Sequence, residues 1–389
     1  SPVPAPGEGR QTVRILQVSP FFDPHAGGVE AYVRRLAEEL GRRGHEVTVL
    51  TSRYDPSLPE DERRPAYRIL RSRTLGVLLD TPIDTGTRRL VRTVEADVAH
   101  LHYPPPLTSY FAARGLAGRR TPVCLTYHCD LYRPGAAGRF LTALYEALFL
   151  PPTLERAQRI ITHTRTYALT STPLRGRRVE VIPSAVDLDR FRPDIDGGPV
   201  RERLGLVGRR VVLFTGRLVP HKGVDQILRA LQRLPSDVAL VVVGRGPKLE
   251  SLLGLSRRLG LEERVRFCPS VSDEELPAYF RAADLFVFPS QNRLEGFGLA
   301  VAEAMASGLP VVVADMPGVR EVIEPGVEGL LTDPLLLGEL AARIEELLVD
   351  PARRASMGAA ARRRAEARYG VATVVDALVK LYGSLTEAG

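Results

Sequence analysis

The chain has 389 residues, of which 44% are hydrophobic and 25% charged, and its formal net charge is +7. This is the composition of a globular protein, and the length predicts two domains rather than one core. No run approaches the roughly 20 apolar residues that span a bilayer. The three cysteines (Cys124, Cys129 and Cys268) match no metal or disulfide pattern, which predicts a cytoplasmic protein.

Residues 1–12 are rich in proline and glycine and contain no apolar stretch, so we expect a disordered leader rather than a secretory signal. The mild positive charge favours anionic ligands or an anionic membrane face. The sequence has no zinc pattern, RNA-binding aromatic motif or basic heptad array, so nucleic acid is not an expected partner.

Short β-branched runs alternate with amphipathic helical stretches along the chain, a pattern typical of parallel α/β layers. Strands are expected in a first series at 13–19, 47–52, 67–70, 98–101, 123–127, 159–164 and 179–182, with a helix at 29–43. A second series is expected at 211–215, 238–243, 265–267, 285–288 and 311–314. Residues 183–199 carry three prolines and a Gly-Gly pair, which indicates an interdomain linker. From residue 336 onward we expect helices.

Ligands of parallel α/β sheets bind beyond the carboxyl ends of the strands, where loops lead into helix N-termini. After the first predicted strand, Gly27 and Gly28 open a helix and allow backbone amides to approach a phosphate or sugar closely. An ordinary turn fits this pair equally well. The loop has no G-x-G-x-x-G pattern, which argues against a dinucleotide dehydrogenase.

Histidines accompany two strands of the first series. We place His100 and His102 on opposite faces of their strand, which argues against a shared metal ion and favours buried, hydrogen-bonded rings. His128 follows the strand 123–127, where an imidazole suits the binding of sugar hydroxyls or of a developing charge. A purely structural histidine fits this position equally well.

The second series begins with a basic motif. Gly216 and Arg217 follow the strand 211–215, and Lys222 leads into the next helix. A planar guanidinium, a compact ammonium and free helix amides together suit a pyrophosphate. Lys222 is also one of only three lysines among 53 basic residues, so its place here indicates function. Gly244, after the next strand, is a further candidate donor-binding position, although an ordinary turn is favoured there.

Two glutamates bracket a glycine-rich loop after the strand 285–288. Glu295 lies in this loop, and Glu303 lies about one turn into an alanine-rich helix, where a solvated charge is hard to explain. Carboxylates accept hydrogen bonds from ribose or hexose hydroxyls, and loop amides face phosphate. The segment between the glutamates therefore supplies further candidate donor-binding residues: Gly296, Phe297, Gly298 and Leu299.

These motifs resemble the retaining glycosyltransferases of family 4. The resemblance is carried by Gly27-Gly28-Val-Glu, by Gly216-Arg217 with Lys222-Gly, and by Glu295-Gly-Phe-Gly-Leu running to Glu303. It implies the α/β GT-B fold, in which two Rossmann-like, doubly wound domains face each other across a cleft. The implied acceptor domain covers 13–190, the donor domain covers 191–368, and a final helix at about 369–389 crosses back to the first domain.

The resemblance also implies a role for each candidate. Arg217 and Lys222 would hold the donor pyrophosphate, and Glu303 the ribose hydroxyls. Glu295 would contact the transferred sugar, His128 would line it, and Gly28 would lie against the phosphates. The implied reaction moves a hexosyl unit from GDP-mannose or a UDP-hexose to a sugar, glycan or lipid-linked acceptor, without a metal ion or a cofactor.

Two departures from the family pattern leave the geometry of one turn and the identity of the base open. Ser184-Ala185 replaces the family's common Asn-Gly, and Cys268-Pro-Ser270 replaces a glycine-containing loop near the base. Two D-x-D strings, at 187–189 and 194–196, match the metal motif of another glycosyltransferase fold, but they lie at the linker.

Two other functions compete with glycosyl transfer: a sugar-nucleotide epimerase or hydrolase of the same fold, and a non-catalytic sugar-binding protein of the periplasmic type. The apolar, arginine-punctuated segment 133–156 favours an acceptor surface, which would contact an anionic membrane at its inner face. Packing of this segment into its own domain is the alternative.

Overall fold

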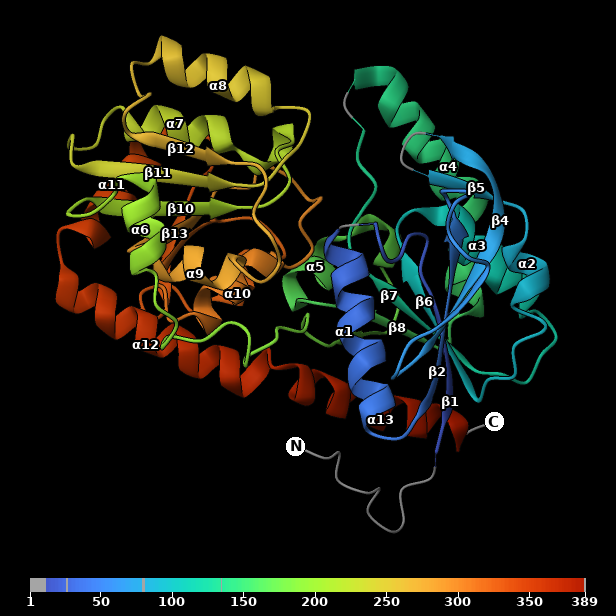
Figure 1. Cartoon of the computed structure of the whole chain (residues 1–389). Helices are drawn as coiled ribbons and strands as arrows, with labels where there is room; N and C mark the ends of the chain where they lie inside the picture. Colours follow the sequence, from blue (N-terminus) through green and yellow to red (C-terminus); the bar gives the residue numbers. More distant parts are fainter. Residues whose placement is uncertain (1–11, 26, 79–80, 134, 388–389) are drawn as a thin grey trace. The chain divides into compact units, whose positions relative to one another are not determined.

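The computed structural model describes residues 12–25, 27–78, 81–133 and 135–387. Of the predicted leader, only Thr12 falls in these ranges. The chain divides into two compact units (Figure 1). Unit 1 joins Ser1–Ala185 to Val371–Gly389, and unit 2 is Val186–Gly370.

Within the described residues, unit 1 is built on a nine-stranded sheet in which the order is β3-β4-β2-β1-β6-β7-β8-β9 and β5 pairs with β4. Its strands are β1 (Arg14–Val18), β2 (Glu46–Arg53), β3 (Asp61–Arg63), β4 (Arg68–Leu78), β5 (Thr81–Asp84), β6 (Val98–Tyr103), β7 (Val123–Tyr127), β8 (Arg159–Thr162) and β9 (Val179–Val181). Neighbours pair in parallel, except that β3 and β5 run antiparallel to β4.

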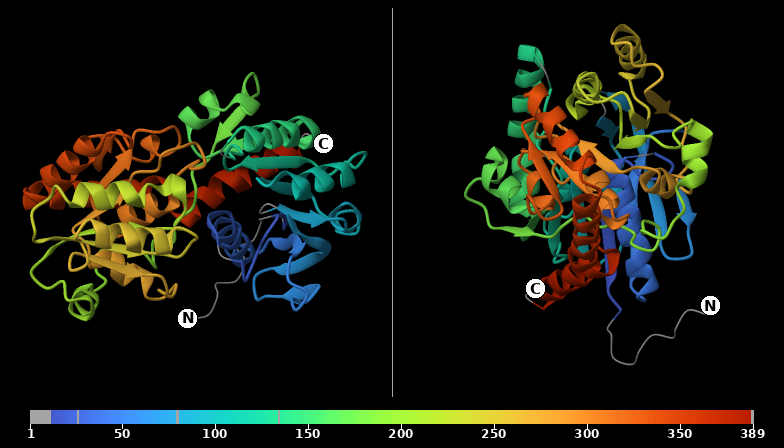
Figure 2. Two further views of the ribbon diagram at one scale, coloured as in Figure 1. Left: turned by 90° about the horizontal axis from the view of Figure 1, so that it is seen from above. Right: turned by 90° about the vertical axis from the view of Figure 1, so that its left-hand side faces the viewer.

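Helices cover both faces of the unit 1 sheet. They are α1 (Gly28–Arg42), α2 (Thr87–Leu90), α3 (Pro106–Gly115), α4 (Gly135–Arg156), α5 (Arg165–Thr170) and α13 (Val371–Thr386), with a 3-10 turn η1 (Thr172–Leu174). One core lies under α1 and α13, and the other lies under α3 and the end of α4. The last helix, α13, lies beside α1 (Figure 2), although more than 300 residues separate them in the chain.

Unit 2 contains a six-stranded, fully parallel sheet within the described residues, with the order β12-β11-β10-β13-β14-β15. The strands are β10 (Arg210–Thr215), β11 (Val238–Val243), β12 (Val265–Cys268), β13 (Leu285–Phe288), β14 (Val311–Ala314) and β15 (Gly329–Thr332). Their buried β-branched runs are those of a sheet covered on both faces. The sequence analysis did not predict β15, because four residues that begin with glycine carry little strand signal.

The helical elements of unit 2 are α6 (Gly198–Leu204), η2 (Pro220–Lys222), α7 (Val224–Leu231), α8 (Leu249–Arg258), α9 (Leu276–Arg281), α10 (Leu299–Ala306), η3 (Arg320–Val322), α11 (Leu337–Leu348) and α12 (Pro351–Arg368). The sheet and these helices share one continuous apolar core. Every βα loop at the carboxyl edge of this sheet therefore rests on a rigid base.

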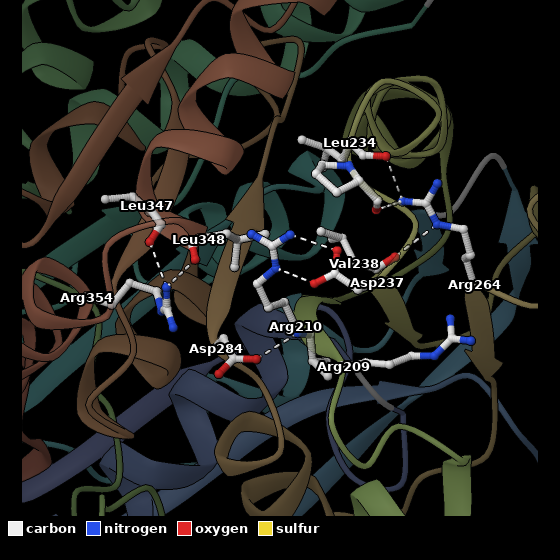
Figure 3. A network of polar contacts seen from close by, with 12 residues as sticks. Arg209, Arg210, Leu234, Asp237, Val238, Arg264, Asp284, Leu347, Leu348 and Arg354 are labelled. Carbon is white, nitrogen blue, oxygen red and sulfur yellow. Dashed lines mark hydrogen bonds and ion pairs between the residues drawn. The ribbon is translucent and has the colours of Figure 1, made fainter.

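The opposite, amino edge of the unit 2 sheet is held by arginines (Figure 3). Arg210, the first residue of β10, binds both carboxylate oxygens of Asp237 at 2.7 Å. Arg264 donates to the carbonyl oxygens of Leu234, Pro235 and Val238 at 2.7–3.2 Å. These contacts fasten loops at the edge away from the candidate site, so they belong to the stability of the unit.

Candidate active site

The first part of the site is a close approach of two backbone loops in unit 2. Gly216 follows β10 with φ of 146°, and Gly244 follows β11 with φ of 136°. A Cβ on Gly244 would lie 2.1 Å from the carbonyl oxygen of Gly216. Only glycine therefore permits these loops to meet. The prediction for Gly244 named a donor contact and an ordinary turn, and the structure provides a tight loop–loop contact there.

Arg217 lies in the first of these loops. Its side chain is exposed and makes no hydrogen bond or ion pair with any residue that the structure describes. Since its neighbours in β10 are buried, the guanidinium is presented from a rigid strand end and remains available to an anionic ligand.

Lys222 forms the centre of the site in unit 2. Its ammonium makes an ion pair with the carboxylate of Glu295, and it lies 4.7 Å from the ring centroid of Phe288. His221 Nε2 lies 3.6 Å from the same carboxylate oxygen. Burial raises the pKa of Glu295, but Lys222 and His221 outweigh that effect and lower the pKa below its ordinary value. Of the three predicted catalytic groups of this unit, Lys222 and Glu295 are thus in direct contact with each other, while Arg217 is not paired with either, and Glu295 is ionised.

The glycine-rich loop after Glu295 is shaped by two left-handed residues. Gly298 caps the N-terminus of α10 with φ of 81°. Gly318, with φ of 95°, approaches so closely that a Cβ there would lie 2.4 Å from the carbonyl oxygen of Glu295. The loop that follows β14 therefore supports the backbone of the glutamate. Gly318 was not among the predicted site residues.

Phe297 and Glu303 offer different groups to a ligand. The Phe297 ring is buried against Tyr369, with centroids 5.3 Å apart, so only its backbone amide is suited to a ligand. Glu303 lies in α10 with only 8% of its surface exposed, among alanines that are fully buried. Leu299 is the first residue of α10. A helix N-terminus and a shielded carboxylate are therefore held on one element.

A cavity of about 530 Å³ lies beside this loop at the carboxyl ends of β14 and β15. Its lining includes Gln291, Asp315, Thr332, Asp333 and Arg343. This cavity was not predicted from the sequence, because β15, whose last residue Thr332 lines it, was not predicted. Its walls carry charges of both signs and do not by themselves select a ligand.

In unit 1, the glycine pair lies at the start of α1. Gly27 is the N-cap residue and Gly28 the first residue of the helix. The carboxylate of Glu30 folds over Gly27, where a Cβ would meet its oxygen at 2.2 Å, and it also lies 2.9 Å from His25 Nδ1. The sequence analysis missed this acidic contact. A phosphate at Gly28 would have to share the loop with the Glu30 carboxylate.

The prediction that His100 and His102 lie on opposite faces of their strand was wrong, whereas the prediction that their rings are buried and hydrogen-bonded is confirmed. Both rings lie on the same face of β6, with centroids 4.4 Å apart. Side chains alternate along a strand, so residues two apart share a face. Both rings are buried, and burial lowers the pKa of His100 to about 3.

His128 lies directly after β7 and is nearly buried. Its Nε2 is 3.1 Å from His102 Nδ1, and its Nδ1 is 2.9 Å from His163 Nε2. Burial, reinforced by His163 and His100, holds its pKa well below the ordinary value. His128 is therefore neutral, and it contacts a sugar through a ring nitrogen only when one of these two hydrogen bonds opens.

The described part of the chain contains no group of three or more histidines, cysteines or carboxylates arranged to hold a metal ion. The D-x-D aspartates form turns instead: Asp187 accepts the amides of Asp189 and Arg190, and Asp196 accepts that of Gly198. Among the described residues, no helix has the length and apolar character needed to cross a membrane.

Comparison with known proteins extends over both units. Residues 200–364 match the model of the glycosyl transferases group 1, and residues 26–190 match that of glycosyltransferase family 4. The chain is 32% identical to a GDP-mannose-dependent alpha-(1-6)-phosphatidylinositol monomannoside mannosyltransferase of Mycolicibacterium smegmatis, over 90% of this chain and 92% of the relative. It is 32% identical to a D-inositol 3-phosphate glycosyltransferase of Xylanimonas cellulosilytica, over 98% and 99%.

The fold has solved counterparts. A sucrose-phosphate synthase from Thermosynechococcus elongatus superposes with a TM-score of 0.82 and 25% identity, covering 97% of this chain and 100% of that one. Two Rossmann-like units of this kind constitute the GT-B fold. The chain belongs to the group 1 glycosyltransferases of family 4, and it is an enzyme that transfers a sugar from a nucleotide-sugar donor.

Proposed function

We propose that this enzyme transfers a mannosyl unit from GDP-mannose, with retention of the anomeric configuration, to an acceptor that contains inositol and is linked to a lipid. The names of two relatives support this choice. One relative is a GDP-mannose-dependent phosphatidylinositol monomannoside mannosyltransferase, and the other is a D-inositol 3-phosphate glycosyltransferase. An inositol-containing acceptor is common to both.

The observation that carries the proposal is the basic site at the carboxyl edge of the unit 2 sheet. Lys222 is held by Glu295, and Arg217 is exposed beside it without a protein partner among the described residues. In our assignment, these cations bind the donor pyrophosphate and stabilise the negative charge that develops on it as the glycosidic bond breaks. Glu303 binds the ribose hydroxyls, and the backbone amides at 296–298 bind phosphate or sugar.

Glu295 and His128 are assigned to the transferred sugar. Glu295 is ionised and accepts hydrogen bonds from sugar hydroxyls, and it is not assigned as a nucleophile. In unit 1, the amides at Gly27 and Gly28 are assigned to phosphate. The assignments of Glu295, His128 and the glycine amides follow the motif resemblance.

The direct test measures transfer with a panel of donors and acceptors. We expect GDP-mannose to be used in preference to UDP-glucose, with a phosphatidylinositol mannoside as acceptor and with free inositol phosphate as the comparison. NMR of the product should show the α-configuration of the donor. Equal use of UDP-hexoses, an inverted product, or donor hydrolysis that no acceptor accelerates would each overturn a part of the proposal.

A lipid-linked acceptor is supported by the apolar surface of α4. Phe140, Leu144 and Leu148 are spaced by four residues and exposed, with Phe140 showing 68% of its surface. Such a stripe on a helix suits an interfacial membrane contact. The end of the same helix packs inward, where Leu150 and Leu154 join the core. The two interpretations of 133–156 thus apply to different turns of one helix.

Membrane contact is tested by sedimentation with vesicles that contain phosphatidylinositol. Replacing Phe140 and Leu144 together by serine should reduce binding at low salt by about tenfold or more, since each removes exposed apolar area from the contact. Leu169→Ser is the matched control, because Leu169 is 70% exposed on α5 of the same unit. Equal binding by wild type and the double variant would remove this support for a lipid-linked acceptor.

A further inference from the structure

A continuous chain of hydrogen bonds runs through the buried interior of unit 1. It begins at the side-chain oxygen of Gln17 in β1, which lies 2.7 Å from His102 Nε2. His102 Nδ1 contacts His128 Nε2 at 3.1 Å, and His128 Nδ1 contacts His163 Nε2 at 2.9 Å. It ends where His163 Nδ1 meets the carbonyl oxygen of Ile182 at 3.0 Å. We call this chain the histidine relay.

The relay has a proton count that its two ends determine. Each of its four contacts requires one proton, because a hydrogen bond needs one donor and one acceptor. Both ends are oxygens, so neither end supplies a proton in the present orientation of Gln17. Three neutral imidazole rings hold only three ring protons. Either one ring is a cation, or the amide of Gln17 turns over and presents its NH2 group to His102.

The surroundings of the relay decide between these arrangements. The rings lie edge-on to Tyr32, at centroid distances of 5.2–6.0 Å, and His100 lies beside them. The pKa values of His102 and His128 are lowered by burial and by the other histidines. Burial lowers the pKa of His163, which the hydrogen bond to the Ile182 carbonyl opposes only in part. A buried cation without a counter-ion is costly. The three rings are therefore neutral.

A neutral relay fixes the direction of every hydrogen bond. His163 must donate from Nδ1, because a carbonyl oxygen only accepts. Its Nε2 then accepts the proton of His128 Nδ1, and His128 Nε2 in turn accepts from His102. The Gln17 amide is turned over, so that its NH2 group donates to His102 Nε2. Its oxygen then takes the place of the present nitrogen, which lies 3.3 Å from the hydroxyl oxygen of Tyr382.

We propose that the histidine relay holds His128 as the tautomer with its proton on Nδ1 and its lone pair on Nε2, and that Gln17 and His163 are positioning residues for sugar transfer. This rests on the proposed function insofar as His128 faces the transferred sugar. In this tautomer, His128 Nε2 accepts a hydrogen bond from a sugar hydroxyl. That hydrogen bond replaces the one that Nε2 accepts from His102. The neutral ring also adds no positive charge beside an oxocarbenium-like transition state.

The tautomer is measured directly by NMR on the full chain labelled with 15N-histidine. We expect a pyrrole-type Nδ1 and a pyridine-type Nε2 for His128 in the wild type. Gln17→Glu has the same size, but its carboxylate only accepts, so it should draw a fourth proton into the relay. We expect this proton on His102, the ring in contact with the carboxylate, so that both His102 nitrogens become pyrrole-type and His128 keeps its tautomer. A wild-type spectrum with the proton on His128 Nε2 would overturn the proposal without any kinetic measurement.

Variants of His163 test the other end. His163→Phe removes the acceptor and should let both tautomers of His128 appear, whereas His163→Gln places an amide oxygen near the same point and should restore the wild-type tautomer. His100→Gln is the matched control, because this ring is equally buried but bonds Tyr382 and Thr126 outside the relay. An unchanged His128 spectrum in His163→Phe would contradict the relay, and so would a Gln17→Glu spectrum in which the added proton lies on His128 and not on His102.

Kinetics then separate this proposal from the proposed function. His163→Phe should lower kcat by at least about tenfold with little change in donor KM, as expected when a group that acts in the transition state is misplaced. His163→Gln and His100→Gln should retain most of the activity. A shifted tautomer with unchanged kcat would refute the positioning role. If the wild type transferred no sugar to any acceptor, the proposed function would fail while the tautomer result stood.

Discussion

Lys222 is paired with Glu295 in the structure. A pyrophosphate that binds Lys222 therefore enters a site in which the ammonium is oriented but shared. The carboxylate then lies next to the donor, where it remains ionised because Lys222 and His221 lower its pKa despite its burial. This coupling gives Glu295 two effects, one on the transferred sugar and one on the lysine.

The two glutamates are expected to respond differently to replacement by glutamine. Glu303→Gln should raise donor KM by about tenfold, or about 1.4 kcal/mol, with little effect on kcat, because the ribose does not change during the reaction. Glu295→Gln should lower kcat by about a hundredfold and leave donor binding nearly intact, since it also frees Lys222 for the pyrophosphate. Steady-state kinetics check both, and equal kcat losses would show that these roles are wrong.

At the scale of residues, the sequence was sufficient for some contacts and not for others. The positions of Lys222 and Glu295 after strands of the second sheet could be predicted, but the ion pair between them was not. The histidine relay was missed, although His102, His128 and His163 stand at the ends of three successive parallel strands. The strand order in space, β1-β6-β7-β8, brings them together. The relay was not predicted because His100 and His102 were assigned to opposite faces of their strand.

At the scale of elements, arginine side chains hold the loops at the amino edge of the unit 2 sheet. Arg264 binds three carbonyl oxygens at the turn that leads into β11 (Figure 3). Its loss leaves these acceptors to water or without partners. The side chains at the amino edge thus contribute to stability and not to the donor binding that we propose at the carboxyl edge.

Arg264→Ala is expected to lower the free energy of unfolding of unit 2 by about 1–3 kcal/mol, because several charge-assisted hydrogen bonds are lost. Donor KM should be unchanged. Arg209→Ala is the control, since this neighbouring side chain makes a single contact of 3.4 Å to Glu263 and should change stability by less than about 0.5 kcal/mol. Thermal unfolding measures both, and a raised donor KM in Arg264→Ala would contradict the separation of the two edges.

Elements with strong periodicity or an apolar β-branched run could be predicted from the sequence, and short strands without such a run could not. α1 was predicted within one residue at each end, because Tyr32, Leu36 and Leu40 form a buried stripe. β3, β5 and β15 have three or four residues each. In strands this short, pairing with a neighbour decides the conformation, and local sequence contributes little.

For the whole molecule, the neutral histidines predict sensitivity to acid that is confined to unit 1. Burial lowers the pKa of His100 to about 3 and that of His163 to about 4. The unfolded chain therefore binds more protons than the folded one below the ordinary histidine pKa of about 6.5. Stability is fully present above that pH and falls by up to about 1.4 kcal/mol per histidine for each pH unit below it.

Calorimetry between pH 7.5 and pH 5 should show the transition of unit 1 moving to lower temperature and that of unit 2 remaining nearly constant. His100→Gln should reduce the pH dependence of the first transition. A transition of unit 1 that does not move in this range would show that the buried rings are not neutral.

The enzyme is also expected to work without a divalent metal. Arg217, Lys222 and the helix-terminal amides supply positive charge for the departing diphosphate. Transfer rates should be unchanged in excess EDTA. Complete loss of turnover, restored by added manganese, would contradict this expectation.

The pairing of α13 with α1 has a consequence for how the protein is made. Unit 1 is interrupted by unit 2, and its core is completed by Leu378, Leu381 and Tyr382 from the last helix. A ribosome delivers these residues only after all of unit 2 has emerged. Unit 2 is continuous, so it is able to fold while unit 1, which begins first, still lacks part of its core. A nascent chain released early would expose an unfinished apolar face, and this marks incomplete copies for the chaperones and proteases of the cell.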